Sequence, residues 1–258
     1  MVKITILGCG GAEGVPMIGC ACQICRSKNP KNKRTRQSIY VETSKTKLLI
    51  DATPDLREQS LKNKIKRIDG LLVTHPHADH IGGLQEFRAF CMLSRRTMNL
   101  FSIKKFLDEI EYRYDYLFQN CPIGKDIAIP ILAGNELKLW TKKKIGDIEF
   151  VPFIQNHGRT ESLGFLFDGF AYSTDFKVLS QRSINLLKGT KLWIVDCLGY
   201  KRDYFAHVGL KDILALYDEI KPEKAIIIHM SHEIDYETFG KKLPKNVKIA
   251  YDGMKIAL

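Results

Sequence analysis

The sequence predicts an α/β domain in which two β-sheets pack face to face, with helices on the outside. Three observations predict this arrangement: short apolar strands end in polar loops, amphipathic helices separate them, and the pattern recurs in two similar halves. The chain has 258 residues and contains no linker, low-complexity segment or short repeat. We therefore expect one domain that spans residues 1–258.

In the first half, apolar runs bounded by glycine or polar residues predict the strands. They are expected at Val2–Leu7, Ser38–Glu42, Lys47–Asp51 and Gly70–Thr74. Apolar residues at helical spacing predict helices over Gly82–Met92 and Ile103–Leu117. The second of these lies in Thr97–Pro130, the only segment long enough to be an insertion, which we interpret as an amphipathic helix with few glycines.

The second half repeats the alternation of strands and helices. Its strands are expected at Ile148–Ile154, Leu163–Phe167, Phe170–Ser173, Trp193–Val195 and Lys224–Ile228. An amphipathic helix over Leu210–Ile220 should end at Lys221-Pro222, because proline cannot continue a helix.

The composition, 45% hydrophobic and 27% charged, excludes a disordered chain. No apolar run approaches the roughly 18 residues of a membrane span, so we expect no membrane partner. The first residues indicate a strand and not an export signal, and seven cysteines are too few for a disulfide scaffold. These features predict a cytoplasmic protein.

The formal charge is +11, from 40 Lys and Arg against 29 Asp and Glu. Such an excess can indicate an anionic partner such as nucleic acid. However, Lys outnumbers Arg 28 to 12 and is scattered along the chain, which favours a general lysine bias. The charge alone therefore does not assign a partner.

The segment from His75 to His80 carries four potential metal ligands directly after a predicted strand. His75 and His77 project the same way in extended backbone, and a turn through Asp79 and His80 can aim a carboxylate and a third imidazole at a second ion. These ligands suit zinc, manganese or iron(II) better than calcium. Three of the seven histidines fall here, which disfavours the alternative of a chance polar loop.

Three further candidate ligands follow predicted strands in the second half: His157, Asp175 and His229. A single histidine after a strand is more often a core or surface residue than a ligand. The motif at His75–His80 leaves coordination positions open, so here these residues are better interpreted as metal ligands. The carboxylate of Asp175 would be placed to bridge two ions.

A separate group of cysteines, Cys20, Cys22 and Cys25, lies in a glycine-flanked loop at 19–26. Three thiolates require a fourth ligand to complete a tetrahedral structural zinc site. The remaining histidines are His207 and His232, and His232 lies only three residues beyond His229. The alternative is that these are free cysteines in a mobile loop.

The stretch Thr74–Gly83 resembles the signature of the metallo-β-lactamase superfamily, with later ligands in the same order. The resemblance implies a four-layer αββα sandwich. It also implies that His75, His77 and His157 hold one catalytic ion, that Asp79, His80 and His229 hold a second, and that Asp175 bridges them. Asp51, at the end of a predicted strand, is interpreted as orienting a ligand imidazole.

The N-terminal segment narrows the resemblance. Gly10–Pro16, Gly19–Cys25, His229–His232 and Tyr251–Met254 are similar to the phosphodiesterases accessory to carbon–phosphorus lyase, which open cyclic phosphates of ribose. That family implies that the three cysteines and His232 bind one structural zinc. It also places an active-site histidine at His207.

The resulting expectation is a phosphodiesterase for small, including cyclic, sugar or nucleotide phosphates. Two zinc or manganese ions about 3.5 Å apart would share a hydroxide and offset the charge that develops during attack. Asp79 and His207 are the catalytic candidates, with His207 as general acid or phosphate donor.

Three alternatives remain open. The first is an RNA-processing nuclease of the tRNA 3′-end type, whose family grips RNA with a protruding arm. The second is a thioester or lactone hydrolase of the same fold, because the same hydroxide attacks carbonyls. The third is a zinc-stabilised binding protein without activity. We expect a small-molecule substrate rather than nucleic acid, and the sequence leaves open whether the chain forms a homodimer.

Overall fold

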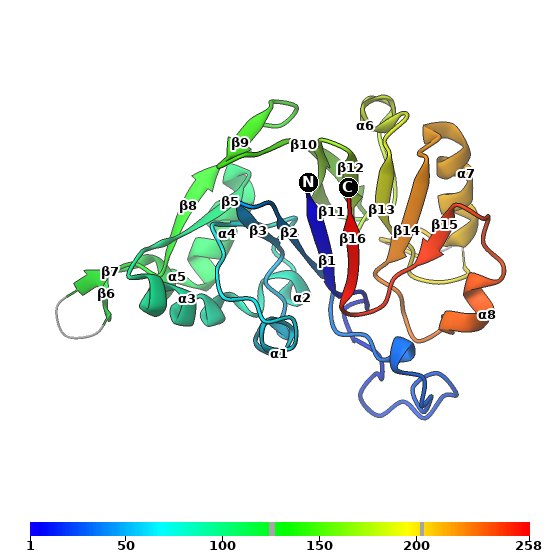
Figure 1. Ribbon diagram of the computed structural model, residues 1–258, viewed down its shortest axis with the longest axis horizontal. Coiled ribbons are helices and arrows are strands. Elements are labelled where there is room, and N and C mark those ends of the chain that lie inside the picture. The colour runs from blue at the N-terminus through cyan, green and yellow to red at the C-terminus, as the bar shows by residue number, and fades with distance from the viewer. Residues whose placement is uncertain (124–126, 202–203) are drawn as a thin grey trace.

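The computed structural model describes residues 1–123, 127–201 and 204–258, and contains two seven-stranded sheets packed face to face (Figure 1). The first sheet, in spatial order, consists of β16 (Met254–Ala257), β1 (Lys3–Gly8), β2 (Ser38–Glu42), β3 (Lys47–Ile50), β4 (Gly70–Leu72), β5 (Met98–Ser102) and β8 (Leu132–Glu136). Strand β16 comes from the C-terminus, so the two ends of the described chain lie side by side in this sheet.

The second sheet is built entirely from the second half of the chain. Its strands, in spatial order, are β15 (Val247–Ile249), β14 (Lys224–Ile228), β13 (Leu192–Asp196), β12 (Phe170–Ser173), β11 (Thr160–Phe167), β10 (Ile148–His157) and β9 (Lys143–Ile145). A separate two-stranded sheet pairs β6 (Cys121–Ile123) with β7 (Ile127–Ile129) at one end of the molecule (Figure 1).

Helices cover the outer faces of both sheets (Figure 1). Against the first sheet lie α1 (Leu56–Lys62), α2 (Ala78–Ile81), α3 (Phe87–Ser94), α4 (Lys104–Arg113) and α5 (Asp115–Phe118). On the second sheet and its C-terminal edge lie α6 (Gln181–Leu187), α7 (Leu210–Ile220) and α8 (Tyr236–Gly240). Two short 3-10 turns complete the described helices, at Pro30–Asn32 and Leu84–Glu86. The four-layer arrangement predicted from the sequence is confirmed.

The alternation of side chains along a strand explains the layers. In β3, Leu48 and Ile50 face the core between the two sheets, whereas Leu49 faces the core beneath the helices of the first half. Both faces of such a strand are buried, which is why the sequence shows a continuous apolar run. Each sheet is thereby fixed against a helical layer on one side and the other sheet on its inner side.

Two helix predictions differ from the structure. The helix expected over Gly82–Met92 begins only at Phe87, because the turn before it packs against the backbone: a Cβ on Gly83 would lie 2.0 Å from the Thr53 carbonyl oxygen. The helix expected over Ile103–Leu117 is broken into α4 and α5 at Tyr114, which has φ −128° and ψ 35°.

The interpretation of Thr97–Pro130 as an amphipathic helix is wrong over much of its length. The segment begins with β5, continues with α4 and α5, and then forms the paired strands β6 and β7. Residues 124–126 of this segment lie outside the described part of the chain. Ile110 and Leu117 are both buried in the core between the first sheet and its helices, as the helical periodicity indicated.

Several strands run from one end of the sandwich to the same opposite end. Strand β3 leads to Asp51, β13 ends at Asp196, and β14 leads to His229. Strand β1 leads into Gly11, whose added Cβ would lie 3.5 Å from His229. The polar residues at these strand ends therefore meet at one edge of the sandwich. No helix in the described part of the chain is long and apolar enough to cross a membrane.

Candidate metal centre

The motif at His75–His80 is divided between a loop and a short helix. Strand β4 delivers Thr74 and His75, both fully buried, to the edge of the sandwich. His77 is extended, with φ −70° and ψ 151°, and immediately precedes α2. Asp79 and His80 lie within α2, so the helical turn directs them away from His77. One short segment thus supplies side chains to two groups.

The first group consists of His75, His77 and His157. The Nε2 atom of His157 lies 3.3 Å from Nδ1 of His77 and 3.7 Å from Oδ2 of Asp175. The Nε2 atom of His75 lies 3.9 Å from the same carboxylate oxygen. The three imidazoles therefore converge beside one oxygen of Asp175.

The second group consists of Asp79, His80 and His229, with the other oxygen of Asp175. Nε2 of His80 lies 3.2 Å from Oδ1 of Asp175 and 3.2 Å from Oδ2 of Asp79. Nε2 of His229 lies 3.3 Å and 3.8 Å from those same two oxygens. The structure thus brings together all seven ligand candidates from the sequence, with the two oxygens of Asp175 facing different groups.

Three of the seven described non-glycine residues with positive φ lie at this edge. Asp51, Asp175 and His229 have φ values of 64°, 50° and 56°, in the left-handed region that L-residues rarely adopt. Each follows the end of a strand, where a left-handed residue turns the chain and redirects the side chain. Residues held in such conformations are found preferentially at functional sites.

The buried imidazoles have nitrogen atoms that the protein leaves without partners. Among the described residues, Nε2 of His75, His80 and His229 is buried with no hydrogen-bond partner. A buried nitrogen without a hydrogen-bond partner carries a substantial free-energy cost. Several such nitrogens that point to one place therefore indicate a site for a metal ion. The donor set of imidazoles and carboxylates fits zinc, manganese or iron(II).

The charges in the cluster are strongly coupled. Burial would raise the pKa of Asp175, but His229 and His80 hold it well below its usual range. Burial likewise opposes the charge on His80, yet Asp175 and Asp79 raise the pKa of that imidazole. At His75, burial and the neighbouring His80 outweigh the effect of Asp175, so its pKa lies well below the ordinary value. The buried carboxylates therefore require positive charge beside them.

Asp51 lies behind the second group. Its Oδ2 is 2.8 Å from Nδ1 of His80, and its Oδ1 accepts hydrogen bonds from the backbone N–H and the hydroxyl of Thr74. Asp51 is fully buried, and burial raises its pKa although His80 and Thr74 oppose the rise. This contact fixes the rotation of the His80 ring and leaves Nε2 free to face the centre.

Asp196 is a functional candidate that was not identified from the sequence. Its Oδ2 lies 2.9 Å from Nδ1 of His207, and its Oδ1 lies 3.5 Å from Nδ1 of His229. The His207 ring stacks on His229 with centroids 4.8 Å apart, and lies 4.9 Å from the ring of His157. His207 is therefore beside the metal-ligand candidates and not beside the cysteines. The position of Asp196 at a strand end, like the other candidates, was the signal that could have identified it.

Gln37 was also missed, and no sequence signal identifies it. Its Oε1 accepts a hydrogen bond from the backbone N–H of His229 at 3.3 Å, and its Nε2 donates to the Tyr172 hydroxyl at 3.2 Å. Both side chains are buried between the sheets. The contact connects the strained backbone of His229 to the opposite sheet.

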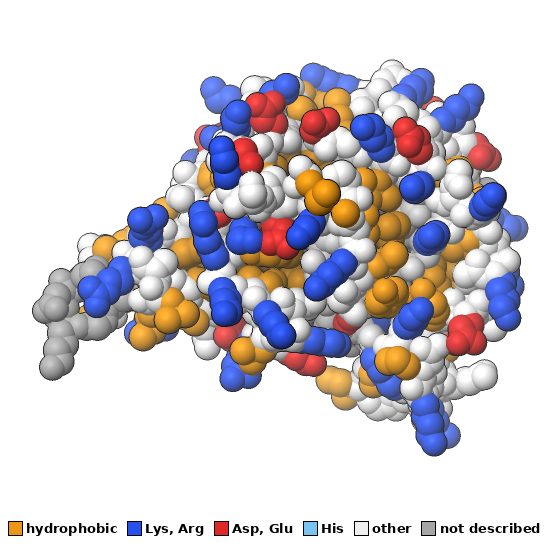
Figure 2. Space-filling view, viewed as in Figure 1, with side chains coloured by type: hydrophobic (Ala, Val, Ile, Leu, Met, Phe, Trp, Pro, Cys, Tyr) orange, Lys and Arg blue, Asp and Glu red, His pale blue; other side chains and the backbone are white. Residues whose placement is uncertain are grey.

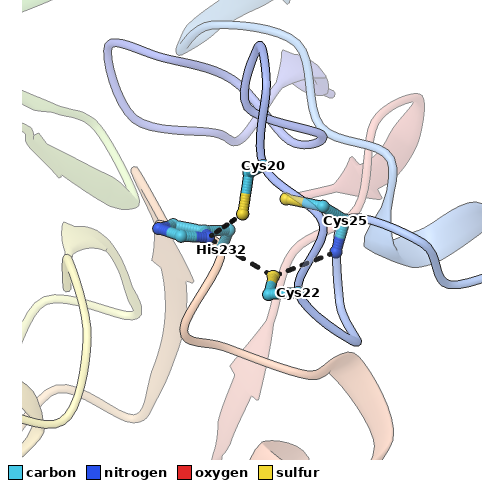
Figure 3. A group of neighbouring side chains, drawn as sticks. All are labelled: Cys20, Cys22, Cys25 and His232. Atoms are coloured by element: carbon cyan, nitrogen blue, oxygen red, sulfur yellow. Dashed lines mark hydrogen bonds between the residues drawn. The ribbon is translucent and has the colours of Figure 1, made fainter.

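The second cluster joins the cysteine loop to the segment after β14 (Figure 3). Nδ1 of His232 lies 3.3 Å from Sγ of Cys20 and 3.4 Å from Sγ of Cys22, with Cys25 beside them. The N–H of Cys25 and the imidazole of His232 lower the pKa of the Cys22 thiol to about 6. The thiolate is the form of cysteine that binds zinc, and a lowered pKa makes it available at neutral pH. His232, and not His207, is therefore the histidine that accompanies the three cysteines.

Comparisons with known proteins agree with this geometry. A model of the β-lactamase superfamily domain matches residues 46–230, which is most of the chain, and the chain belongs to that superfamily. It has the metallo-β-lactamase fold and histidine and aspartate clusters of metal-binding type. Within the superfamily the chain is PhnP-like. A crystal structure described as a new diphosphatase from the PhnP family is 30% identical, covers 99% of this chain and 96% of its own, and has a TM-score of 0.90.

Two curated relatives broaden the comparison. An octanoyltransferase of Porphyromonas gingivalis is 31% identical over 256 residues, 98% of this chain, but only 51% of the relative is matched. The chain thus spans about half the length of that protein. Exodeoxyribonuclease YycJ of Bacillus anthracis is 28% identical over 173 residues, covering 63% of this chain and 58% of the relative.

Proposed function

We propose that this chain is a metal-dependent phosphodiesterase that hydrolyses small, including cyclic, sugar or nucleotide phosphodiesters. The single observation that carries the proposal is the position of Asp175, whose two oxygens each face a separate group of buried imidazoles. Such a carboxylate is suited to two adjacent cations, the arrangement used for in-line displacement at phosphorus. The PhnP-family diphosphatase supports a phosphate substrate.

His75, His77 and His157 would hold one divalent ion, and Asp79, His80 and His229 the other, with Asp175 between them. Zinc or manganese bound there would supply positive charge to the phosphate oxygens and make a water molecule more acidic. Asp51 fixes the rotation of His80, and Asp196 places a negative charge 3.5 Å from Nδ1 of His229. The strained backbone at Asp175 and His229 keeps both side chains directed inward before substrate binds.

His207 is assigned to proton transfer or phosphate binding. Because Asp196 accepts the hydrogen bond from Nδ1–H, the Nε2 atom is left for the substrate. A protonated Nε2 can donate to a non-bridging phosphate oxygen or to the departing alkoxide. The side chain retains 18% exposure, so a substrate can reach it.

The cysteine cluster is proposed to bind one structural zinc through Cys20, Cys22, Cys25 and His232. Three thiolates and one imidazole complete a tetrahedral site with no position open for substrate. His232 lies three residues beyond His229, so this zinc would anchor the segment that carries a catalytic ligand.

The test is a substrate panel with the purified protein loaded with Mn²⁺ or Zn²⁺. We expect turnover of bis(p-nitrophenyl) phosphate and of a ribose cyclic phosphate, and loss of both after removal of the ions with a chelator. A precursor tRNA and an octanoyl thioester serve as comparison substrates. Absence of phosphodiester turnover with every ion would reject the proposal and favour a binding protein, whereas faster thioester cleavage would favour an acyl hydrolase.

A nuclease is the second candidate because of one structural feature. The paired strands β6 and β7 stand at the end of the molecule, away from the two large sheets (Figure 1). The nuclease family resembled by this fold uses a protruding arm to hold RNA, and exodeoxyribonuclease YycJ also acts on a nucleic acid. Specific cleavage of precursor tRNA that is lost when residues 121–129 are deleted would favour this candidate over a small substrate.

A further inference from the structure

Two grooves on one face of the molecule contain most of the chain's excess positive charge. The first, of about 540 Å³, is lined by the cations Lys3, Lys47, Lys64, Lys66, Arg67 and Lys255. The second, of about 640 Å³, is lined by Lys191, Lys224, Lys245, Lys248 and again Lys255. Strand β16 lies between the grooves and contributes Lys255, Ile256 and Ala257 to both. Figure 2 shows this face, with Lys and Arg side chains around hydrophobic hollows.

The charge is local and not uniformly scattered. The two grooves contain ten Lys and Arg but only two acids, Glu42 and Glu223, so they account for eight of the eleven net positive charges. The remainder of the chain is close to neutral. The lysine bias inferred from composition alone therefore does not explain where these residues lie.

Most of these cations form no ion pair within the described part of the chain. In the first groove, Lys47 binds Glu42 and Arg67 binds Asp69. None of the five lysines of the second groove forms an ion pair with any described residue, and all five are exposed. Unpaired cations held close together repel one another, and a polyanion would relieve this repulsion.

The basic face lies at the opposite end of the strands from the metal centre. Strand β14 begins at Lys224 and leads to His229, and β13 begins one residue after Lys191 and ends at Asp196. At about 3.3 Å per residue, these strands separate the two surfaces by roughly 15 Å. An anion bound in the grooves is therefore a different ligand from the substrate at the metals.

We infer that this face docks the phosphate backbone of double-stranded nucleic acid, without reading its sequence. Nine of the ten cations are Lys, a point charge that can neutralise phosphates, and only Arg67 has the fork that reads base edges, so the surface fits binding without sequence readout. The only aromatic residue in the two grooves is Tyr40, which is buried and donates to the Arg67 carbonyl, so bases have no stacking surface. A second copy of this chain does not fit, because β16 would present Lys255 to another basic edge.

The inference goes beyond the proposed hydrolase activity and does not depend on it. Docked nucleic acid would tether the enzyme and would not itself reach the metals from this face. The test compares two variants with equal charge change. The groove variant replaces Lys191, Lys224, Lys245 and Lys248 with Gln, and the control replaces Lys104, Lys105, Lys142 and Lys144, which pair with acids elsewhere.

Binding is measured by fluorescence anisotropy with a labelled 30-base-pair DNA duplex at 50 to 300 mM NaCl. We expect the groove variant to lose affinity about ten-fold or more at 50 mM salt and to show a shallower salt dependence, by about one unit of slope per contact removed. The control variant should bind like the wild type. Turnover of a small phosphodiester should be unchanged in both variants, which separates this test from that of the proposed function.

Three outcomes would overturn the inference. The first is that the wild type fails to bind the duplex at 50 mM NaCl. The second is that both variants lose affinity equally, which would show an effect of net charge and not of this face. The third is that poly-glutamate of matched charge binds more tightly than the duplex, which would assign the surface to an acidic protein. Circular dichroism of both variants establishes that the fold is retained.

Discussion

The Nδ1 atom of His207 lies 2.9 Å from Oδ2 of Asp196, a carboxylate with no solvent exposure. Burial would raise the pKa of Asp196, but His207 and His229 hold it below its usual value, so the carboxylate is ionised at neutral pH. A buried negative charge beside an imidazole fixes the tautomer and stabilises the protonated ring. Asp196 thereby connects the proposed proton donor to a proposed metal ligand.

Asp196→Asn should lower kcat by about 10- to 100-fold, because the amide no longer fixes the orientation and tautomer of His207. Asp196 is a positioning residue, so its effect should depend on His207. In a double-mutant cycle, Asp196→Asn should have little further effect in a His207→Ala background. Bound metal is measured in each variant. Additive losses, or a metal content that falls with activity, would assign Asp196 to metal binding through His229 instead.

Asp175→Ala should abolish phosphodiesterase turnover and lose more metal than His207→Ala. The reason is that the Asp175 carboxylate contacts both imidazole groups, whereas His207 does not connect the two proposed ion sites. Turnover of bis(p-nitrophenyl) phosphate and metal content by mass spectrometry are measured together. Asp168→Ala, at an exposed turn, is the matched control. Full activity in Asp175→Ala with intact metal would reject the bridging assignment.

Cys22→Ser should remove about one zinc per chain and lower the free energy of unfolding, with a smaller effect on kcat. The low pKa of Cys22, about 6, means that its thiolate is present at neutral pH, and serine does not supply one. Cys121→Ser, outside this cluster, should retain the full zinc content. Equal zinc in the wild type and Cys22→Ser would count against the structural site.

Asp235 connects α8 to the 3-10 turn Pro30–Asn32, which follows the cysteine-bearing loop. Its Oδ1 accepts from the Thr238 N–H at 2.9 Å, and its Oδ2 accepts from Asn32 at 2.7 Å. These hydrogen bonds lower the pKa of Asp235, and the one from the Thr238 N–H has the largest effect. A carboxyl group whose folded-state pKa is depressed stabilises the fold above its unfolded pKa, and this contribution is lost as the pH falls through the folded value.

Asp235→Ala should therefore reduce the free energy of unfolding by about 1 kcal/mol at pH 7, because the helix loses its N-cap. The difference from the wild type should shrink as the pH falls from about 4, the pKa of the carboxyl in the unfolded chain, through the lower pKa of the folded state. Urea unfolding at pH 7 and pH 3 measures both values. A difference of the same size at the two pH values would show that the ionised carboxylate is not the stabilising form.

The strands and ligand candidates that the sequence predicted well share a physical basis. Ser38–Glu42, Phe170–Ser173 and Lys224–Ile228 are buried strands, and the helix Leu210–Ile220 has one apolar face, so local periodicity encodes them directly. Errors occurred where backbone contacts outweigh periodicity. The late start of α3 depends on the close approach of Gly83 to Thr53, which has no local signal.

The sequence by itself determined which chemistry the chain carries: imidazoles and carboxylates directly after buried strands, and three closely spaced thiols. These are properties of residue type and short spacing, and they are written locally. The tertiary structure decided which groups meet. Cys20 and His232 are 212 positions apart in the sequence. The contact of Asp196 with His207, the position of Asp175 between two imidazole groups and the basic grooves beside β16 likewise depend on how distant segments pack together. Long-range packing sets these contacts, because the side chains involved have no preference for one another until the two sheets close.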